Sequence, residues 1–479
     1  MNGPAITFII GWVLRLEAAL MVPSWLVSHI YREQEGWVFG VAMAVCLLLS
    51  IPLIAAGKKR KLFQTREGLA AVALSWIALS VCGAIPFVLS GAIPDPVDAL
   101  FETVSGFTTT GASILPSVER LPRCILFWRS FTHWIGGMGV LVFLLSVIRL
   151  AGGSHMNLMK AESPGPSVGK LTPKVQSTAK ILYGIYIALT LLEVLFLLAG
   201  GMSMFDSLAT SLGTAGTGGF GIRDDSMASY SPYLQNVVTV FMILFGINFN
   251  VYFFLLCKKV KQALRIEELW WYLGVIAASV AAISWNVRGF YHTAGETVRH
   301  AAFQVATVIT TSGFSTVDFD LWPSLSKTIL VLLMFIGACA GSTGGGIKVS
   351  RLLILWKSVR LECRRYLHPQ EVRTLRMDGH GVDGEVVRST HMYMAVYLLL
   401  FAVSVLAISL DGKDLITNFT AVAATFNNIG PGLSLVGPVH NFGFFSPFAK
   451  LVLIFDMLAG RLELFPMLML FLPQTWKRF

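Results

Sequence analysis

Four short runs of small and hydroxyl-bearing residues could bind a cation through their backbone carbonyl oxygen atoms. The runs are TTTGAS, TGGFG, TSGFS and NNIGPG, and each has a glycine two positions after a threonine or asparagine. These glycines are roughly 100 residues apart, at Gly111, Gly219, Gly313 and Gly430. Because glycine tolerates backbone angles that other residues avoid, each run can turn successive carbonyl groups the same way. A ring of such groups can replace the water around a cation, as potassium filters do.

The segments before these runs also share a pattern. Each is short and semi-apolar, and Asp98 and Asp206 stand at the same offset before their glycines. This predicts internal repetition, with short helices whose C-terminal ends would point partial negative charge at a pore. The alternative is that the small residues only let helices pack closely. Close packing does not account for four polar runs that each follow a helix too short to span a bilayer.

The elements that must position these runs are membrane helices. The 479 residues are 55% hydrophobic and 13% charged, with a mean hydropathy of +0.68. Uncharged windows long enough to cross a bilayer recur, for example at 37–56, 69–90 and 392–410. The first apolar run, about 5–30, carries Arg15 and Glu17 and has no small-residue cleavage site, so we expect it to be retained as a spanning helix.

The net charge of +10 is concentrated in short connectors. The basic connectors are 58–61, 160–180, 258–261, 348–388 and the C-terminal Lys477 and Arg478. This distribution indicates cytoplasmic loops of a multi-pass protein rather than a nucleic-acid-binding surface, and it places both termini in the cytoplasm. The six cysteines lie in apolar runs or basic connectors, so no external disulfide framework is expected.

The repeat pattern predicts an all-α polytopic fold with ten spanning helices and four pore helices. Four membrane–pore–membrane units with approximate fourfold symmetry would follow a two-helix extension. The expected boundaries are 1–60 for the extension and 61–155, 156–265, 266–385 and 386–479 for the four units.

The combined motifs resemble the TrkH/TrkG/KtrB superfamily of potassium transporters. The resemblance rests on the four glycine runs together with GSTGGGIKVSR at 341–351 and GRLELF at 460–465, and the two N-terminal helices favour the TrkH branch. It implies potassium as the transported substrate, the bacterial inner membrane, a homodimer surrounded by lipid, and a cytosolic nucleotide-binding regulatory partner of the TrkA type. The second loop is unusually rich in glycine, and Asn428 stands where the other loops have threonine.

The resemblance also implies which atoms would meet the ion. Two consecutive carbonyl groups from each loop would bind potassium, and the residue two before each glycine would form an inner ring. The implied carbonyl ligands are Thr110, Gly111, Gly218, Gly219, Ser312, Gly313, Ile429 and Gly430. The implied inner ring is Thr109, Thr217, Thr311 and Asn428.

A second glycine cluster follows the apolar run TILVLLMFIGACA, where it would unwind a helix inside the bilayer. The resemblance makes this cluster an intramembrane gate, and Arg461, which interrupts the last apolar run, should face the pore or a partner. The alternatives are a simple helix kink and a structural ion pair. The expected gate residues are Gly341, Gly344, Gly345, Gly346, Lys348 and Arg461.

Other functions fit the sequence less well. GTGGFG at 216–221 matches a dinucleotide-binding pattern, but a loop follows it where such a site needs a helix. The nine histidines are scattered, so clustered enzyme chemistry is not expected. A structural scaffold would need no filter. The other transported ion to consider is sodium, or a mixture of monovalent cations.

Overall fold

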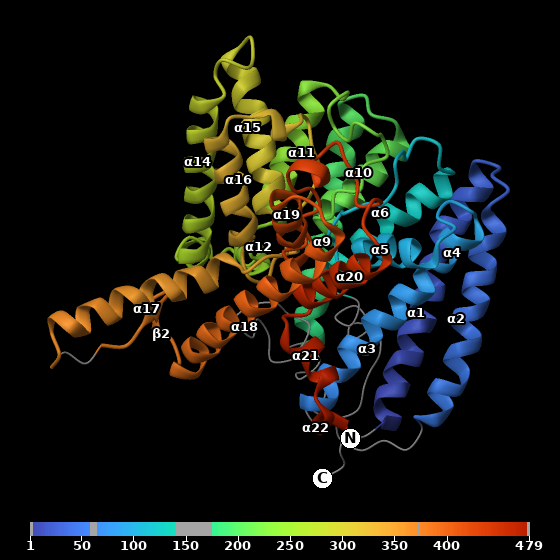
Figure 1. The fold of residues 1–479 in the computed structure, drawn as a ribbon, viewed down its shortest axis with the longest axis horizontal. Coiled ribbons are helices and arrows are strands. Elements are labelled where there is room, and N and C mark those ends of the chain that lie inside the picture. The colour runs from blue at the N-terminus through green and yellow to red at the C-terminus, as the bar shows by residue number, and fades with distance from the viewer. Residues whose placement is uncertain (1–2, 58–64, 140–174, 371–372, 477–479) are drawn as a thin grey trace.

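The computed structural model describes residues 3–57, 65–139, 175–370 and 373–476. The predicted all-α class is confirmed, since the only described strands are the two-residue β1 (Arg376–Met377) and β2 (His380–Gly381). The basic connector 58–61, most of 160–180, and Lys477 with Arg478 lie outside the described residues. The two ends of the chain lie near each other at the bottom of Figure 1.

The N-terminal extension is a pair of long helices at one edge of the molecule (Figure 1). α1 (Gly3–Ile30) packs along α2 (Gly36–Ala56) and also contacts α3 (Thr65–Gly83) and α6 (Arg123–Gly137). α3 continues into the short α4 (Ile85–Leu89). Both helices of the pair are predominantly apolar, and inside a bilayer van der Waals packing along their shared face, rather than a hydrophobic force, holds such helices together.

Four short helices lie at the centre of the bundle. They are α5 (Pro96–Phe107), α10 (Met204–Gly216), α15 (Ala294–Ile309) and α19 (Leu415–Phe426). A helix of 12 to 16 residues is at most about 24 Å long and cannot cross a hydrocarbon core of about 30 Å. Each begins with a side-chain cap that accepts a hydrogen bond from a backbone amide of its first turn, and the capping residues are Asp95, Ser203, Thr293 and Asp414.

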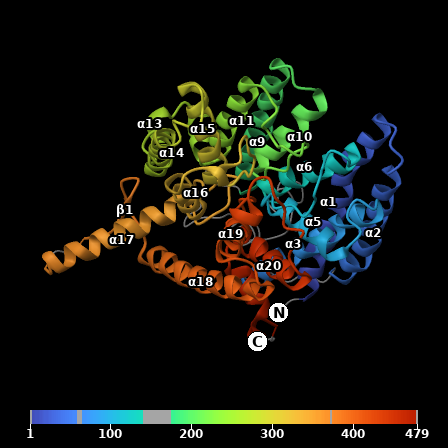
Figure 2. The same cartoon turned by 45° about the horizontal axis from the view of Figure 1, so that its top comes forward.

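The helices that precede the short helices are longer than those that follow them. Long apolar helices precede three of them: α9 (Val175–Ala199), α14 (Glu267–Asn286) and α18 (Gly384–Ile408). The helices that follow are shorter: α6, α11 (Pro232–Phe245), α16 (Ser324–Ile336) and α20 (Pro447–Arg461). Figure 2 shows these elements gathered around the centre of the molecule.

Several of the following helices are broken inside the bundle. α11 meets α12 (Phe249–Leu256) at 88°. α16 ends at Ile336, and the last apolar run divides into α20 and α21 (Phe465–Phe471), which α22 (Pro473–Trp476) follows. Among the described residues, six helices are long and apolar enough to cross a membrane, or seven if α11 and α12 form one span. The prediction of ten spans stays a prediction.

The remaining elements lie at the periphery. α17 (Val349–Leu367) projects away from the bundle in both views (Figures 1 and 2). α13 (Val260–Ala263) joins α12 to α14, and the 3-10 helices are η1 (Phe319–Leu321), η2 (Ser409–Asp411) and η3 (Ser434–Val436). η1 lies in the loop after α15, and η3 lies in the loop after α19. α17 belongs to the predicted basic connector 348–388.

Candidate ion-binding site

The four predicted glycines meet in a closed ring. A Cβ atom built on any of them would lie within 2.8 Å of a carbonyl oxygen from another loop. The pairs are Gly111 with Gly218, Gly219 with Ser312, Gly313 with Ile429, and Gly430 with Thr110. Each glycine thus lies against the carbonyl group just before the glycine of the next loop, and the fourth loop closes on the first. Sequence positions more than 300 residues apart therefore form one site.

The loops share their backbone geometry as well as their positions. In each loop, φ is positive at the glycine and again two residues earlier. The earlier residues are Thr109, Thr217, Thr311 and Asn428, with φ between 55° and 59°. A left-handed conformation is uncommon for threonine, so four cases at one offset indicate a common backbone path. The four residues that the resemblance implies as an inner ring therefore have equivalent backbone positions in the four loops.

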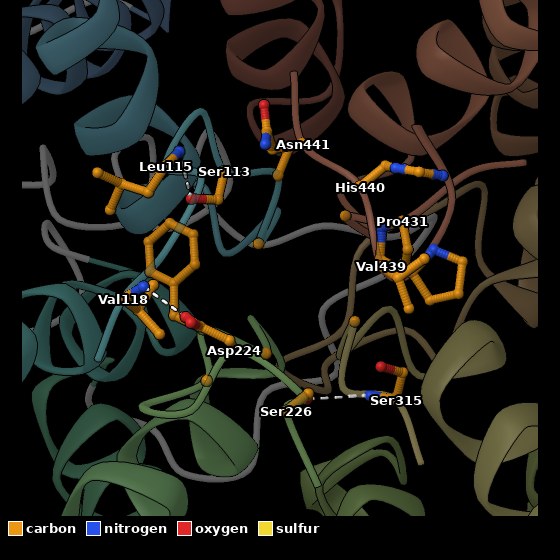
Figure 3. A pocket seen from close by; sticks show the side chains of 18 of the residues that line it. Ser113, Leu115, Val118, Asp224, Ser226, Ser315, Pro431, Val439, His440 and Asn441 are labelled. Atoms are coloured by element: carbon orange, nitrogen blue, oxygen red, sulfur yellow. Dashed lines mark hydrogen bonds between the residues drawn. The ribbon is translucent and has the colours of Figure 1, made fainter. Parts of the chain in front are cut away.

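A polar hollow of about 130 Å³ lies between this ring and the outer loops. All four glycines line it, together with residues such as Asp224, Ser315, His440 and Asn441. Figure 3 shows Asp224 accepting a hydrogen bond from the Val118 amide, and Ser226 bonded to the Ser315 amide across the hollow. The loops that precede and follow the glycines therefore enclose the approach to the ring.

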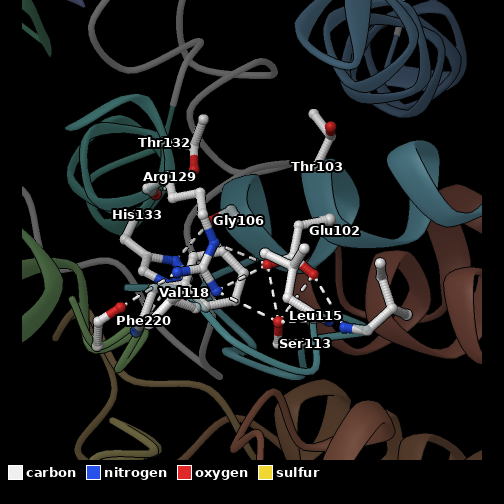
Figure 4. Close-up of polar contacts among 12 residues, drawn as sticks. Glu102, Thr103, Gly106, Ser113, Leu115, Val118, Arg129, Thr132, His133 and Phe220 are labelled. Carbon is white, nitrogen blue, oxygen red and sulfur yellow. Dashed lines mark hydrogen bonds and ion pairs between the residues drawn. The ribbon is translucent and has the colours of Figure 1, made fainter. Parts of the chain in front are cut away.

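A buried ion pair holds the first loop in place (Figure 4). Arg129 of α6 lies 2.7 Å from a carboxylate oxygen of Glu102, and both side chains are almost fully buried. Glu102 also accepts hydrogen bonds from the Ser113 hydroxyl and the Ile114 amide, and Arg129 donates to the carbonyl oxygen of Gly221 in the second loop. Sequence analysis missed Glu102, although a carboxylate inside an apolar pore helix was the available signal.

His133 of α6 links the end of α5, just before the first loop, to the second loop. Its Nδ1 lies 2.8 Å from the Gly106 carbonyl oxygen, and its Nε2 accepts from the Phe220 amide (Figure 4). A neutral ring with its proton on Nδ1 satisfies both contacts. Arg129 and His133, which stand at i and i+4 on α6, thus both make polar contacts within the bundle.

Two of the loops contain the same contact between a pair of hydroxyl groups. The hydroxyls of Thr108 and Thr110 lie 2.8 Å apart, and those of Thr310 and Ser312 lie 2.9 Å apart. In the fourth loop the Asn428 amide donates instead to the Thr110 hydroxyl and to a backbone carbonyl of α20. The substitution of asparagine for threonine therefore adds a direct bond between the fourth loop and the first.

The predicted glycine cluster lies directly against the inner side of the ring. The chain is irregular from Gly337 to Lys348, which is longer than the predicted 341–346, and we call it the inner loop. The Gly345 amide donates to the Thr311 hydroxyl at 2.6 Å. A Cβ on Gly344 would lie 2.9 Å from the Thr310 carbonyl oxygen. The inner loop thus contacts the inner ring itself.

Side chains fasten both ends of the inner loop. A carboxylate oxygen of Glu268 in α14 accepts from the amides of Ala340 and Ser350, at 2.7 Å and 3.0 Å. The buried ammonium group of Lys348 donates to the Gly344 carbonyl oxygen. The carbonyl oxygen of Gly341 accepts from the amide of Phe249. Sequence analysis listed Lys348 and Gly341 but missed Glu268, which lies 72 residues from its first partner.

Arg461 connects the inner loop to α6. Its guanidinium donates to the Thr343 carbonyl oxygen and to those of Gly136 and Gly137, at 2.6 to 2.9 Å. These contacts agree with the expectation that Arg461 faces protein rather than lipid. Glu463, two residues further along, pairs instead with Arg351 of α17. Gly346, the last predicted gate glycine, packs against Gly337.

Comparison with known proteins agrees with this architecture. The sequence profile of TrkH, described as a cation transport protein, matches residues 37–276 and 288–478. The chain is 37% identical to the Trk system potassium uptake protein TrkH of Escherichia coli K12 over the whole of both chains. It is 32% identical to the Trk system potassium uptake protein TrkG of the same organism, over 98% of each chain.

A solved structure is similar as well. The crystal structure of the potassium transporter TrkH from Vibrio parahaemolyticus matches with a TM-score of 0.89 and 32% identity over all of both chains. The family comprises transport proteins rather than enzymes. Its members, together with the six or seven apolar helices among the described residues, indicate a multi-pass membrane protein. The chain belongs to the TrkH family of cation transport proteins.

Proposed function

We propose that this protein takes up potassium ions through the ring of Gly111, Gly219, Gly313 and Gly430. The observation that carries the proposal is the closed sequence of glycine–carbonyl contacts, because carbonyl oxygens held in a ring can replace the hydration shell of a cation. The relatives named as potassium uptake proteins support potassium as the ion. The implied ligands are the carbonyl oxygens listed above, two from each of four pseudo-symmetric units.

The experiment is uptake of rubidium, a potassium surrogate, into liposomes that contain the purified chain. Potassium should compete strongly with rubidium, whereas sodium and lithium should compete weakly. Equal competition by potassium and sodium would instead support the alternative, a sodium or non-selective monovalent-cation path. Liposomes without protein provide the background.

The inner loop and Arg461 would form the gate of this path. The loop contacts the inner ring, so it stands where an ion leaving the ring would pass. A guanidinium near that exit would oppose a cation, and a glycine-rich segment can change its backbone angles readily. Movement of this part of the loop would break the bond from the Gly345 amide to Thr311 and the bond from Arg461 to Thr343, and water in an open path could replace both.

The projecting α17 is the proposed link to regulation and assembly. It begins directly after the inner loop, and it exposes both basic side chains and large apolar ones such as Trp356 and Tyr366. We assign this region to contacts with a second copy in a homodimer and with a TrkA-type nucleotide-binding subunit in the cytosol. We also propose that the protein lies in the bacterial inner membrane with both termini in the cytoplasm, because basic connectors favour the cytoplasmic side. Cross-linking of a cysteine introduced at Trp356 to a second copy would test the dimer.

A further inference from the structure

A second cluster of possible ligands lies far from the ring, within the N-terminal helices. The carboxylate of Glu17 and the thiols of Cys46 and Cys82 have ligand atoms that all lie within 4.8 Å of one another. They come from α1, α2 and α3, which lie together in Figure 1. Among the described residues, no other three His, Cys, Asp or Glu side chains meet in this way.

The carboxylate is the unusual member. Glu17 is 1% exposed, and within the described part of the chain neither of its carboxylate oxygens has a hydrogen-bond partner. Burying a carboxylate without a partner is costly inside a membrane protein, and a bound cation would offset that cost. Both thiols are buried beside it, at 0% and 5% exposure.

The three groups suit a thiophilic divalent cation. Thiolate sulfur favours soft or borderline metals, whereas a carboxylate oxygen disfavours the softest of them, and the mixture is typical of Zn²⁺. Tetrahedral ligand atoms around Zn²⁺ are separated by roughly 3.6–3.8 Å. The present separations of up to 4.8 Å could therefore close by small side-chain rotations. One carboxylate and two thiolates would offset the charge of the ion within a medium of low dielectric and leave the site with one net negative charge.

We propose that Glu17, Cys46 and Cys82 form a binding site for a divalent cation of the Zn²⁺ class. The ion would join the N-terminal pair of helices to the first unit. It would also act near the first pore helix, because a Cβ on Gly83 would lie 3.1 Å from Glu17 and 3.0 Å from Thr103 of α5. The site is separate from the ring, and the proposal does not depend on which ion the ring carries.

The test uses Cd²⁺ alone with the full-length chain in detergent under reducing conditions. The parent variant retains only Cys46 and Cys82, through Cys124→Ala, Cys257→Ser, Cys339→Ala and Cys363→Ser. We expect about one Cd²⁺ per chain with a thiolate-to-metal ultraviolet band, and a higher thermal midpoint when the ion is bound. Glu17→Gln should weaken binding about tenfold, and Cys46→Ser or Cys82→Ser should remove the band.

The matched control adds Cys46→Ser and Cys82→Ser to the parent variant, so that it contains no cysteine, and it should bind no stoichiometric Cd²⁺. Absence of binding in the parent, or binding that survives in this control, would overturn the proposal. So would a Cys46–Cys82 disulfide in the chain as isolated. If the cysteine variants do not fold, X-ray absorption on the native chain with one Cd²⁺ decides: two sulfur neighbours with oxygen support the site, and a shell without sulfur refutes it.

Discussion

The ring and the inner loop are adjacent, but they are held in different ways. In the ring, glycines allow backbone to approach backbone so closely that a single added carbon would collide in all four loops. In the inner loop, side chains such as Glu268, Lys348 and Arg461 fasten the backbone from outside. The inner loop also has close glycine contacts, such as Gly345 with the Asn427 carbonyl oxygen, and backbone bonds, such as that from the Phe249 amide to Gly341. The ring can change only by distorting the loops that form it, whereas the side-chain bonds of the inner loop can break without distorting the ring.

This difference predicts two separable classes of variant. A substitution in the ring should change which ion passes, because it shifts the carbonyl oxygens that select the ion. A substitution in the inner loop should change how much ion passes without changing which one. Each prediction below tests that separation.

The largest effect is expected at Gly111 and Gly219. A Cβ on either would lie 1.9 Å from a carbonyl oxygen, whereas the corresponding distances at Gly313 and Gly430 are 2.6 and 2.8 Å. Replacement by serine or alanine at Gly111 or Gly219 should lower the preference for rubidium over sodium by at least about tenfold, or roughly 1.4 kcal/mol. At Gly313 and Gly430 we expect a loss of about threefold. Uptake of both ions into liposomes measures the ratio.

Gly91→Ala is the control for this series. Gly91 also has a positive φ, of 72°, but nothing lies within 4 Å of a Cβ built there. It reports the cost of backbone strain alone and should leave selectivity unchanged. If all four ring variants match Gly91→Ala in their ion preference, the ring is not the filter.

The second effect concerns the gate. Arg461→Ala, or deletion of Gly344–Gly346, should raise basal rubidium flux by about fivefold, because each removes a contact that holds the inner loop against the exit. The preference for rubidium over sodium should stay at the parent value. Regulation by an added nucleotide-binding subunit should weaken in both variants.

Arg461→Lys separates charge from hydrogen bonding at this position. Lysine keeps the positive charge but cannot reach Thr343, Gly136 and Gly137 with one planar group. Flux near the parent value in Arg461→Lys would assign the barrier to charge, and flux like that of Arg461→Ala would assign it to the bonds. Parent-level flux in both Arg461→Ala and the deletion, with expression confirmed, would place the barrier elsewhere.

The sequence predicted the ring better than its supports, for a physical reason. A glycine that must adopt a positive φ, and a threonine two positions before it, form a local pattern that repeats along the chain. Glu102 and Glu268 act through partners that only folding brings near, such as the amide of Ala340. The break at the end of α20 was also missed, because nothing in the local sequence marks the positive φ that Glu463 and Leu464 adopt.

A smaller effect is expected from Glu268. Glu268→Ala removes the acceptor shared by Ala340 and Ser350, so basal flux should rise about two- to threefold with selectivity unchanged. Its neighbour Glu267 provides the control, since it pairs with Lys357 in α17 and makes no bond to the inner loop in the described structure. A change in ion preference in Glu268→Ala would contradict the separation of ring and inner loop.

The smallest effect is expected at the outer hollow, from Asp224→Asn. Burial alone would raise the pKa of Asp224, but hydrogen bonds from Ser117 and the Val118 amide, with the charge of Arg120, lower it overall. The carboxylate therefore stays ionised at neutral pH, and its bond to the first outer loop would be lost only as the pH falls through this lowered pKa.

Because Asp224 is exposed, its attraction for an approaching cation is screened by salt within about 8 Å. We expect Asp224→Asn to reduce rubidium uptake by less than about twofold, at low ionic strength and low rubidium only. Equal loss at high salt would mean that Asp224 acts by holding the ring in shape, and a changed ion preference would extend the ring's influence to the outer loops.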